Sequence, residues 1–201
     1  MIRLGVLISG SGTNLQAIID AISAGRLEAR IVLVVSSKAD AYGLTRAREA
    51  GIPTLALTRD DYADPLAADK RIVQALRDAG ADYVVLAGYM RRVRVPLLDA
   101  FPNRIVNIHP ALLPSFIGAH GTADAFAYGV KVTGVTIHFA NEDYDRGPII
   151  AQQAVAIAED DTLESLEAKI HAVEHELFPR VLQLIAQGRV SVGEDGKARI
   201  L

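Results

Sequence analysis

Short apolar runs alternate with amphipathic segments through the first half of the chain. The runs are rich in Val, Ile and Leu and short enough for buried strands, at residues 4–9, 29–35, 54–57, 83–87 and 105–109. Between them, apolar residues recur every three or four positions, which predicts helices at 14–24, 41–50, 64–79 and 96–100. This alternation predicts an α/β fold with a mostly parallel, Rossmann-like twisted sheet and helices on both faces.

The second half of the chain follows a different pattern. Residues 133–139 and 149–157 predict strands separated by a polar loop, which favours a less regular, partly antiparallel edge. The segment Asp161–Glu164 has the pattern of a capping box with Asp161 as the cap, and it starts a long helix to about Gln187. Pro179 is expected to kink or split that helix, because proline lacks the N–H that a helix needs. Residues 191–201 predict a weak hairpin, and the lack of repeats and linkers predicts one domain over residues 1–201.

Composition narrows the possible functions. Half of the 201 residues are apolar, which predicts one sizeable core. The net charge is -3 with acids and bases mixed along the chain, so we expect no broad basic surface for nucleic acid or for an anionic membrane. There is no cysteine, which excludes disulfides, thiolate nucleophiles and Cys-ligated zinc and fits a cytoplasmic protein. An anionic ligand must therefore bind at a local site.

A glycine-rich loop, residues 10–14, joins the first predicted strand to the first predicted helix. Glycines let backbone N–H groups approach a ligand, and a helix N-terminus adds unpaired donors, so phosphate is the expected ligand. No Gly-Lys-Ser/Thr follows, so this is not a Walker loop. Leu15 stands at the third glycine position of the dinucleotide fingerprint, which disfavours a nicotinamide cofactor. A plain tight turn with Asn14 as the helix cap is the alternative.

Asn107 and His109 lie two residues apart at the end of a predicted strand, so both side chains project to one face, with Ile108 on the other. An amide and an imidazole side by side can donate hydrogen bonds to one developing oxyanion. Asp145, in a turn-rich loop before the next strand, is the carboxylate that we pair with His109. A structural histidine and a turn-capping aspartate are alternatives that the residues leave open.

Four motifs occur in order along the chain: ISGSGTNLQ at 8–16, LAGYMR at 86–91, NIHPALLP at 107–114 and DRGPII at 145–150. Together they resemble the folate-dependent phosphoribosylglycinamide formyltransferases, also called glycinamide ribonucleotide transformylases. The resemblance extends to about residue 188. Each motif is short, but four of them in this order are highly specific.

The resemblance implies transfer of the formyl group of 10-formyltetrahydrofolate to the amine of glycinamide ribonucleotide in de novo purine synthesis, without a metal. It implies that Asn107 and a cationic His109 stabilise the tetrahedral oxyanion. Asp145 would hold the imidazole and raise its pKa, as a nearby carboxylate does.

The resemblance also implies the residues that bind the substrates. The ribonucleotide would contact Gly12, Thr13, Asn14 and Glu174. The folate would contact Met90, Arg91, Arg92, Val93, Asn107, Asn141 and Asp145, with the loop 141–145 closing over the pterin. His120 and His138 are expected near the site.

The chain departs from the family pattern at three positions. Many members carry an arginine where this chain has Pro65, relatives often have glutamine in place of His171, and a proline is expected where Ile117 precedes Gly118. These departures affect peripheral contacts. We also expect no extra regulatory or carboxyl-terminal domain, because the chain starts at its first predicted strand and has no room for one.

Three other functions stay open. The chain could be a related folate-dependent enzyme of formyl transfer or hydrolysis. A non-catalytic nucleotide-binding domain would explain the glycine loop but not the pairing of Asn107 with His109. Residues 171–175 also match the H-x-x-E-H zinc pattern on a helix, with His171 and His175 one turn apart.

Overall fold

The computed structural model describes residues 1–201 and contains a seven-stranded sheet in the order β3-β2-β1-β4-β5-β6-β7. The strands are β1 (Ile2–Ile8), β2 (Ala29–Ser36), β3 (Thr54–Ala56), β4 (Tyr83–Leu86), β5 (Ile105–His109), β6 (Val132–Phe139) and β7 (Ile149–Ala156). Strands β1 to β5 pair in parallel, whereas β6 pairs antiparallel with both β5 and β7. The predicted mostly parallel sheet with an antiparallel edge is confirmed.

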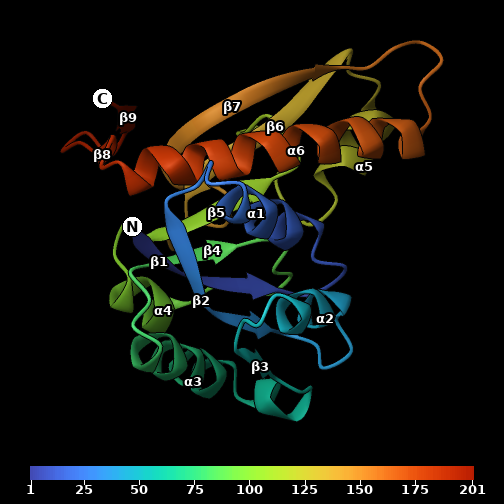
Figure 1. Cartoon of the computed structure of the whole chain (residues 1–201). Helices are drawn as coiled ribbons and strands as arrows, with labels where there is room; N and C mark the ends of the chain where they lie inside the picture. The colour runs from blue at the N-terminus through green and yellow to red at the C-terminus, as the bar shows by residue number, and fades with distance from the viewer.

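Helices cover both faces of the sheet (Figure 1). On one face, α1 (Thr13–Ser23) packs against α6 (Leu163–Ala186), and Ile18 and Phe178 join a large buried cluster with the strands. On the other face, α3 (Pro65–Asp78) and α4 (Val95–Ala100) bury Ile72 and Leu97 in a second cluster. Smaller elements are α2 (Tyr42–Glu49), the 3-10 helix η1 (Asp60–Ala63), α5 (Gly121–Tyr128) and the hairpin of β8 (Val190–Val192) and β9 (Ala198–Ile200).

In the second half one helix, α5, was not predicted, the cap of α6 differs from the prediction, and the split that was one of two expectations at Pro179 is absent. The cap of α6 is Thr162 rather than Asp161: its hydroxyl accepts from the Ser165 N–H at 3.2 Å, and the Ser165 hydroxyl accepts from the Thr162 N–H at 3.0 Å. Pro179 lies inside α6 without splitting it. Pro179 is buried with its neighbour Phe178, so packing onto the sheet offsets the lost backbone bond.

The register of the parallel strands brings their carboxyl ends together. Ile8 of β1 pairs with Ser36 of β2, and Leu86 of β4 pairs with Asn107 of β5. The connections that leave these strands therefore lie side by side, which is where open α/β sheets bind ligands. None of the helices combines the length and the apolar character that a membrane crossing requires.

Candidate active site

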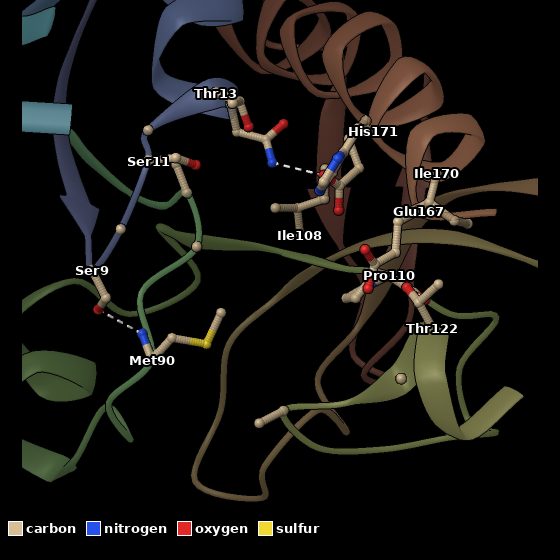
Figure 2. Close-up of a pocket in the computed structure, with 18 of the residues that line it drawn as sticks. Ser9, Ser11, Thr13, Met90, Ile108, Pro110, Thr122, Glu167, Ile170 and His171 are labelled. Carbon is tan, nitrogen blue, oxygen red and sulfur yellow. Dashed lines mark hydrogen bonds between the residues drawn. The ribbon is translucent and has the colours of Figure 1, made fainter. Parts of the chain in front are cut away.

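A cavity of about 500 Å³ lies beside the glycine loop at the carboxyl ends of the strands. One wall is the loop Ser9–Asn14, and the wall opposite is α6, with Glu167, Ile170, His171 and Glu174. Figure 2 shows Ser11 and Thr13 on the loop side and His171 on the helix side, with Pro110 and Thr122 at a further side. Because α1 begins at Thr13, the N–H groups of its first turn stand at this cavity. Gly12, Thr13, Asn14 and Glu174 are thus brought together.

Gly12 is required by packing as well as by backbone conformation. Its φ is 72°, in the left-handed region, and a Cβ there would lie 2.6 Å from the Cα of Gly43 in α2. The Gly43 N–H donates to the Gly10 carbonyl at 3.1 Å, which holds the loop against α2. Gly10 is different, because a Cβ there would meet no heavy atom within 4 Å. The tight turn therefore accounts for Gly12, whereas Gly10 lines the cavity free of that constraint.

Lys38, which the sequence patterns did not single out, lines the same cavity and is the only Lys or Arg among its lining residues. Its backbone is fixed by Ser36, whose hydroxyl donates to the Lys38 carbonyl at 2.7 Å and accepts from the Lys38 N–H at 3.2 Å. The side chain stays exposed. A position two residues beyond a parallel strand is the signal that could have identified it.

Asn14 and Glu174 form a buried polar pair at the base of this cavity. The Asn14 amide donates to a Glu174 carboxyl oxygen at 2.9 Å, across 160 positions of sequence. Burial raises the pKa of Glu174, and the bond from Asn14 opposes part of that rise. The amide oxygen of Asn14 is buried without a partner, so it can accept a hydrogen bond from a ligand.

A second, much smaller cavity of about 40 Å³ lies on the other side of β5. Ile108 lines the larger cavity and Asn107 the smaller one, as the alternation of a strand requires. The walls come from the loop after β4 and the loop between β6 and β7, and include Arg91, Arg92, Val93, Asn141 and Asp145. Ligand cavities usually hold about 300–1,000 Å³, so this one must widen before it can admit a pterin ring.

Arginines tie the walls of the smaller cavity to their surroundings. The Arg92 guanidinium donates to the Glu142 carbonyl at 2.9 Å, which links the two loops across the cavity. Arg91 stacks over the Tyr62 ring at 4.3 Å. Met90 does not join this group, because it lines the larger cavity and its N–H donates to the Ser9 hydroxyl at 2.8 Å (Figure 2).

Asn107, His109 and Asp145 converge although Asp145 lies more than 30 positions away in sequence. His109 Nδ1 lies 3.4 Å from Asp145 Oδ2, and both side chains are 4% exposed. The Asn107 amide nitrogen lies 3.4 Å from Asp145 Oδ1. Asp145 has a φ of 54° and its carboxylate accepts from the Gly118 N–H at 3.1 Å. The predicted contact between Asp145 and His109 is therefore present in the structure.

His138 orients the Asn107 amide. His138 Nδ1 lies 2.9 Å from the Phe139 carbonyl, which can only accept, so this nitrogen carries the proton. In the neutral ring Nε2 accepts from the Asn107 amide nitrogen at 3.0 Å, and in the protonated ring the same nitrogen faces Asp145 Oδ1 at 3.7 Å. His138 thus stands at the site as expected, while His120 lines the larger cavity instead.

The pKa of His109 is shifted in the direction opposite to the one expected from the sequence. Burial lowers the pKa of His109, and the Asp145 carboxylate and the Phe116 carbonyl counteract only part of this effect. The prediction of a raised pKa is therefore wrong, because the side chain is only 4% exposed and a buried cation loses its hydration. Burial also raises the pKa of Asp145, but contacts with His138, His109 and Gly118 lower it by more, so this carboxyl is ionised at neutral pH.

Two acceptors flank the His109 ring. Nε2 lies 2.8 Å from the Phe116 carbonyl, and Nδ1 faces Asp145. A neutral imidazole has one N–H and can satisfy only one of them. Phe116 has a φ of 53°, an unfavourable conformation for a bulky residue. The segment after Pro114 therefore covers the nitrogen of His109 that points away from Asp145.

The residues of the zinc pattern do not form a metal site. The rings of His171 and His175 stack with centroids 6.1 Å apart and planes 6° apart. No group of three or more His, Asp or Glu side chains in the structure could hold a metal ion.

Comparison with known proteins adds independent information. The family model described as formyl transferase matches residues 2–182. Phosphoribosylglycinamide formyltransferase of Haemophilus influenzae is 40% identical over 203 residues, which cover 98% of this chain and 96% of that protein. The crystal structure of glycinamide ribonucleotide transformylase 1 from Symbiobacterium toebii has a TM-score of 0.96 at 50% identity and covers 100% of this chain and 94% of that one.

Longer relatives also contain this unit. The trifunctional purine biosynthetic protein adenosine-3 of Bos taurus is 44% identical over 195 residues, and that of Homo sapiens is 43% identical over 195 residues. These matches cover 97% of this chain and 19% of each relative. The chain therefore spans about a fifth of the length of these relatives.

Proposed function

Since this chain belongs to the formyl transferase family, we propose that it transfers the formyl group of 10-formyltetrahydrofolate to the amine of glycinamide ribonucleotide, a step of de novo purine synthesis. The observation that carries the proposal is the meeting of Asn107, His109 and Asp145 at β5, between two cavities of different character. The larger cavity would hold the ribonucleotide and the smaller one the folate.

The ribonucleotide would bind through backbone as much as through side chains. The N–H groups at the start of α1 suit its phosphate, and Lys38 adds a positive charge. Asn14 and Glu174 would meet the rest of this substrate, because they offer an unpartnered amide oxygen and a buried carboxyl. The folate would contact Arg91, Arg92 and Val93 and the loop 141–145 once that side has widened.

In the proposed reaction, the amine of the ribonucleotide forms a bond to the formyl carbon, and the carbonyl oxygen becomes an oxyanion. The Asn107 amide would donate to this oxyanion. Since the pKa of His109 is lowered, the ring is neutral before reaction and can take the proton that the amine loses. The imidazolium then forms beside Asp145, which stabilises it, and the proton passes to the folate nitrogen as its bond to the formyl carbon breaks.

This sequence of steps requires a small rearrangement of the segment that contains Phe116. With a proton on Nδ1 toward Asp145, Nε2 is the nitrogen left to exchange protons with substrate. The Phe116 carbonyl oxygen lies 2.8 Å from that nitrogen and blocks it from the substrate. Substrate binding would therefore displace the carbonyl, which is consistent with the unfavourable φ of Phe116.

The proposal is tested by incubating the purified chain with glycinamide ribonucleotide and 10-formyltetrahydrofolate. We expect stoichiometric formation of formylglycinamide ribonucleotide and tetrahydrofolate. Release of formate without a formylated product would show a hydrolase instead. Binding of the ribonucleotide without turnover of the folate would show a non-catalytic nucleotide-binding domain.

We also propose that residues 1–201 form one formyltransferase domain, since the β8–β9 hairpin packs Val190, Val192 and Ala198 against the main core. Glycinamide ribonucleotide and 10-formyltetrahydrofolate are the proposed small-molecule partners. A cytoplasmic location stays a prediction from the cysteine-free sequence.

A further inference from the structure

Helix α2 holds two successive carbonyl groups of the glycine loop. The Gly10 carbonyl accepts from the Gly43 N–H at 3.1 Å. The next carbonyl along the chain, that of Ser11, accepts from Nε of the Arg46 side chain at 2.9 Å. Both donors belong to α2, one through its backbone and one through a side chain. Together the two bonds fix how two neighbouring peptide groups of the loop are oriented.

This orientation decides where the N–H groups of the loop point. The peptide bonds of the loop are trans, and in a trans peptide the C=O and the following N–H point in opposite directions. Because the carbonyls of Gly10 and Ser11 are turned to α2, the N–H groups of Ser11 and Gly12 are turned away from it, toward the cavity of about 500 Å³ that the loop lines. Neither N–H donates to a backbone carbonyl. Successive N–H groups that point the same way form a site for an anion.

The Arg46 side chain is itself held from several sides. Its Nη1 donates to the Gln16 side-chain oxygen at 3.2 Å, and the Gln16 amide nitrogen donates to Asp20 at 2.8 Å, which keeps that oxygen turned to Arg46. The guanidinium lies over the Tyr42 ring, 4.9 Å from its centroid. The Arg46 Cδ would lie 3.5 Å from a Cβ on Gly12, so the stem of the side chain packs against the loop. The bond to the Ser11 carbonyl therefore comes from a donor that is already in place.

We propose that Arg46 is a positioning residue for phosphate: it turns the peptide group between Ser11 and Gly12 so that the Gly12 N–H meets the phosphate of the ribonucleotide. The inference rests on the proposed function, which assigns the ribonucleotide to the larger cavity. Arg46 does not line that cavity, so it acts on the substrate through the loop. Without its bond this peptide group can turn over, because glycine accepts many backbone conformations, and a carbonyl would then face the phosphate.

Arg46→Met tests the proposal, because methionine keeps an unbranched apolar stem and removes every donor. We expect KM for the ribonucleotide to rise about tenfold, as for the loss of roughly one charge-assisted hydrogen bond, with kcat and KM for the folate unchanged. Arg48→Met, at an exposed position of the same helix, is the matched control and should leave all three constants unchanged. An unchanged KM for the ribonucleotide in a folded Arg46→Met variant, or equal losses for both substrates, would overturn the proposal.

Arg46→Lys separates positioning from charge. Lysine keeps the positive charge but lacks the planar fork, so it cannot hold the Ser11 carbonyl and the Gln16 oxygen in the same geometry. We expect most of the rise in KM for the ribonucleotide to persist in this variant. Full recovery of the wild-type KM would show that a charge behind the loop is sufficient and would contradict a positioning role.

Inorganic phosphate provides a test that needs no turnover. In wild-type protein labelled with ¹⁵N, phosphate should shift the amide signals of Ser11 and Gly12, and its Kd should be about tenfold higher in Arg46→Met. A chain that behaves in this way but forms no formylated ribonucleotide would refute the proposed function and keep the positioning role. A chain that formylates the ribonucleotide, with the same phosphate Kd in wild type and Arg46→Met, would refute the positioning role alone.

A measurement on the wild type keeps the proposal falsifiable if the Arg46 variants do not fold. The Nε–H of Arg46 should exchange with water much more slowly than that of the exposed Arg48, because it is bonded to the Ser11 carbonyl. Equal exchange rates would show that this bond does not persist in solution, and the proposal would fall.

Discussion

The two cavities on either side of β5 are built in opposite ways. The larger, of about 500 Å³, is framed by the glycine loop, the start of α1 and the length of α6, all of them held by packing. The smaller, of about 40 Å³, is framed by two connections without regular structure that a hydrogen bond from Arg92 holds together. The difference indicates that the ribonucleotide would enter a preformed site. The folate would bind only after the two connections around the smaller cavity move apart.

The residues of β5 divide between these two regions. Ile108 faces the larger cavity, Asn107 faces the smaller one, and His109 is covered by the segment that contains Phe116. Catalysis would therefore depend on the side that has to widen, and binding of the ribonucleotide on the side that is already open. Single substitutions should therefore change kcat and the KM for the ribonucleotide independently.

The largest effect should follow from Asn107→Ala. Loss of one oxyanion donor lowers kcat by about 10²–10³-fold, and KM for the ribonucleotide should change little, because Asn107 faces away from the larger cavity. Steady-state kinetics with each substrate varied in turn measures both constants. Ile108→Val, on the opposite face of the strand, is the control and should keep kcat near normal. A folded Asn107→Ala variant with near-normal turnover would remove this residue from the mechanism.

Asp145→Asn should lower kcat by about 10²-fold, within the range of general acid–base catalysis. Asparagine tolerates the φ of 54° at this position, so the backbone should be preserved. Burial already lowers the pKa of His109, and loss of the Asp145 charge removes a contribution that raises it.

NMR titration of His109 decides the role of Asp145. The pKa should lie below 6.5 in the wild type and lower still in Asp145→Asn. The imidazolium is then populated only as pH falls further, and it is harder to form during the reaction. An unchanged pKa together with normal activity would leave Asp145 as a turn residue only.

Gly10→Val should impair the larger cavity alone. Gly10 lines the cavity and an added Cβ meets no heavy atom within 4 Å, so a side chain there should obstruct the ligand rather than the fold. KM for the ribonucleotide should rise about tenfold, the effect of losing roughly one charge-assisted hydrogen bond, with KM for the folate unchanged. Gly12→Val is the comparison: the clash with Gly43 should lower Tm and impair both substrates alike. Equal losses for both substrates in a stable Gly10→Val variant would contradict a phosphate site at the loop.

Lys38→Gln should have the smallest effect. Because the side chain is exposed, loss of its charge should raise KM for the ribonucleotide only about two- to fivefold. The difference from wild type should shrink at high salt, since an exposed charge is screened. Lys38→Arg should recover most of the affinity, and Lys70→Gln, an exposed residue of α3, should be neutral. Salt-independent loss would indicate a structural role for Lys38.

The sequence predicted most of the sheet because each buried strand has its own apolar run. Strand β5 agrees at both ends with the expected 105–109. Helix α5 was missed because Gly121–Tyr128 has little amphipathic character and no side chain caps its start. The cap of α6 was assigned one residue early, because Asp161, Thr162 and Ser165 all have capping side chains and only the fold shows that Asp161 instead accepts from the Ala158 N–H at 2.7 Å.

The site was predictable where chemistry follows from local order and unpredictable where it depends on burial. Alternation along β5 correctly placed Asn107 and Ile108 on opposite sides. The pKa of His109 could not be foreseen, because the sequence does not show how completely the ring is buried or that the Phe116 carbonyl lies against it. The contact of Gly12 with Gly43 joins residues 31 positions apart and leaves no mark in either local pattern.

Because of that contact, the first turn of α2 limits which residues the proposed phosphate loop can accept, although α2 itself does not contact the phosphate site. Gly43 lines neither proposed cavity, yet a Cβ on it would lie 2.5 Å from a methyl of Ile8 and 3.2 Å from the Gly12 Cα. A substitution at either glycine therefore requires a simultaneous change in its neighbour. A mutant library that varies 10–14 alone would sample few functional loops, whereas one that varies position 43 together with the loop would reach geometries that single replacements cannot.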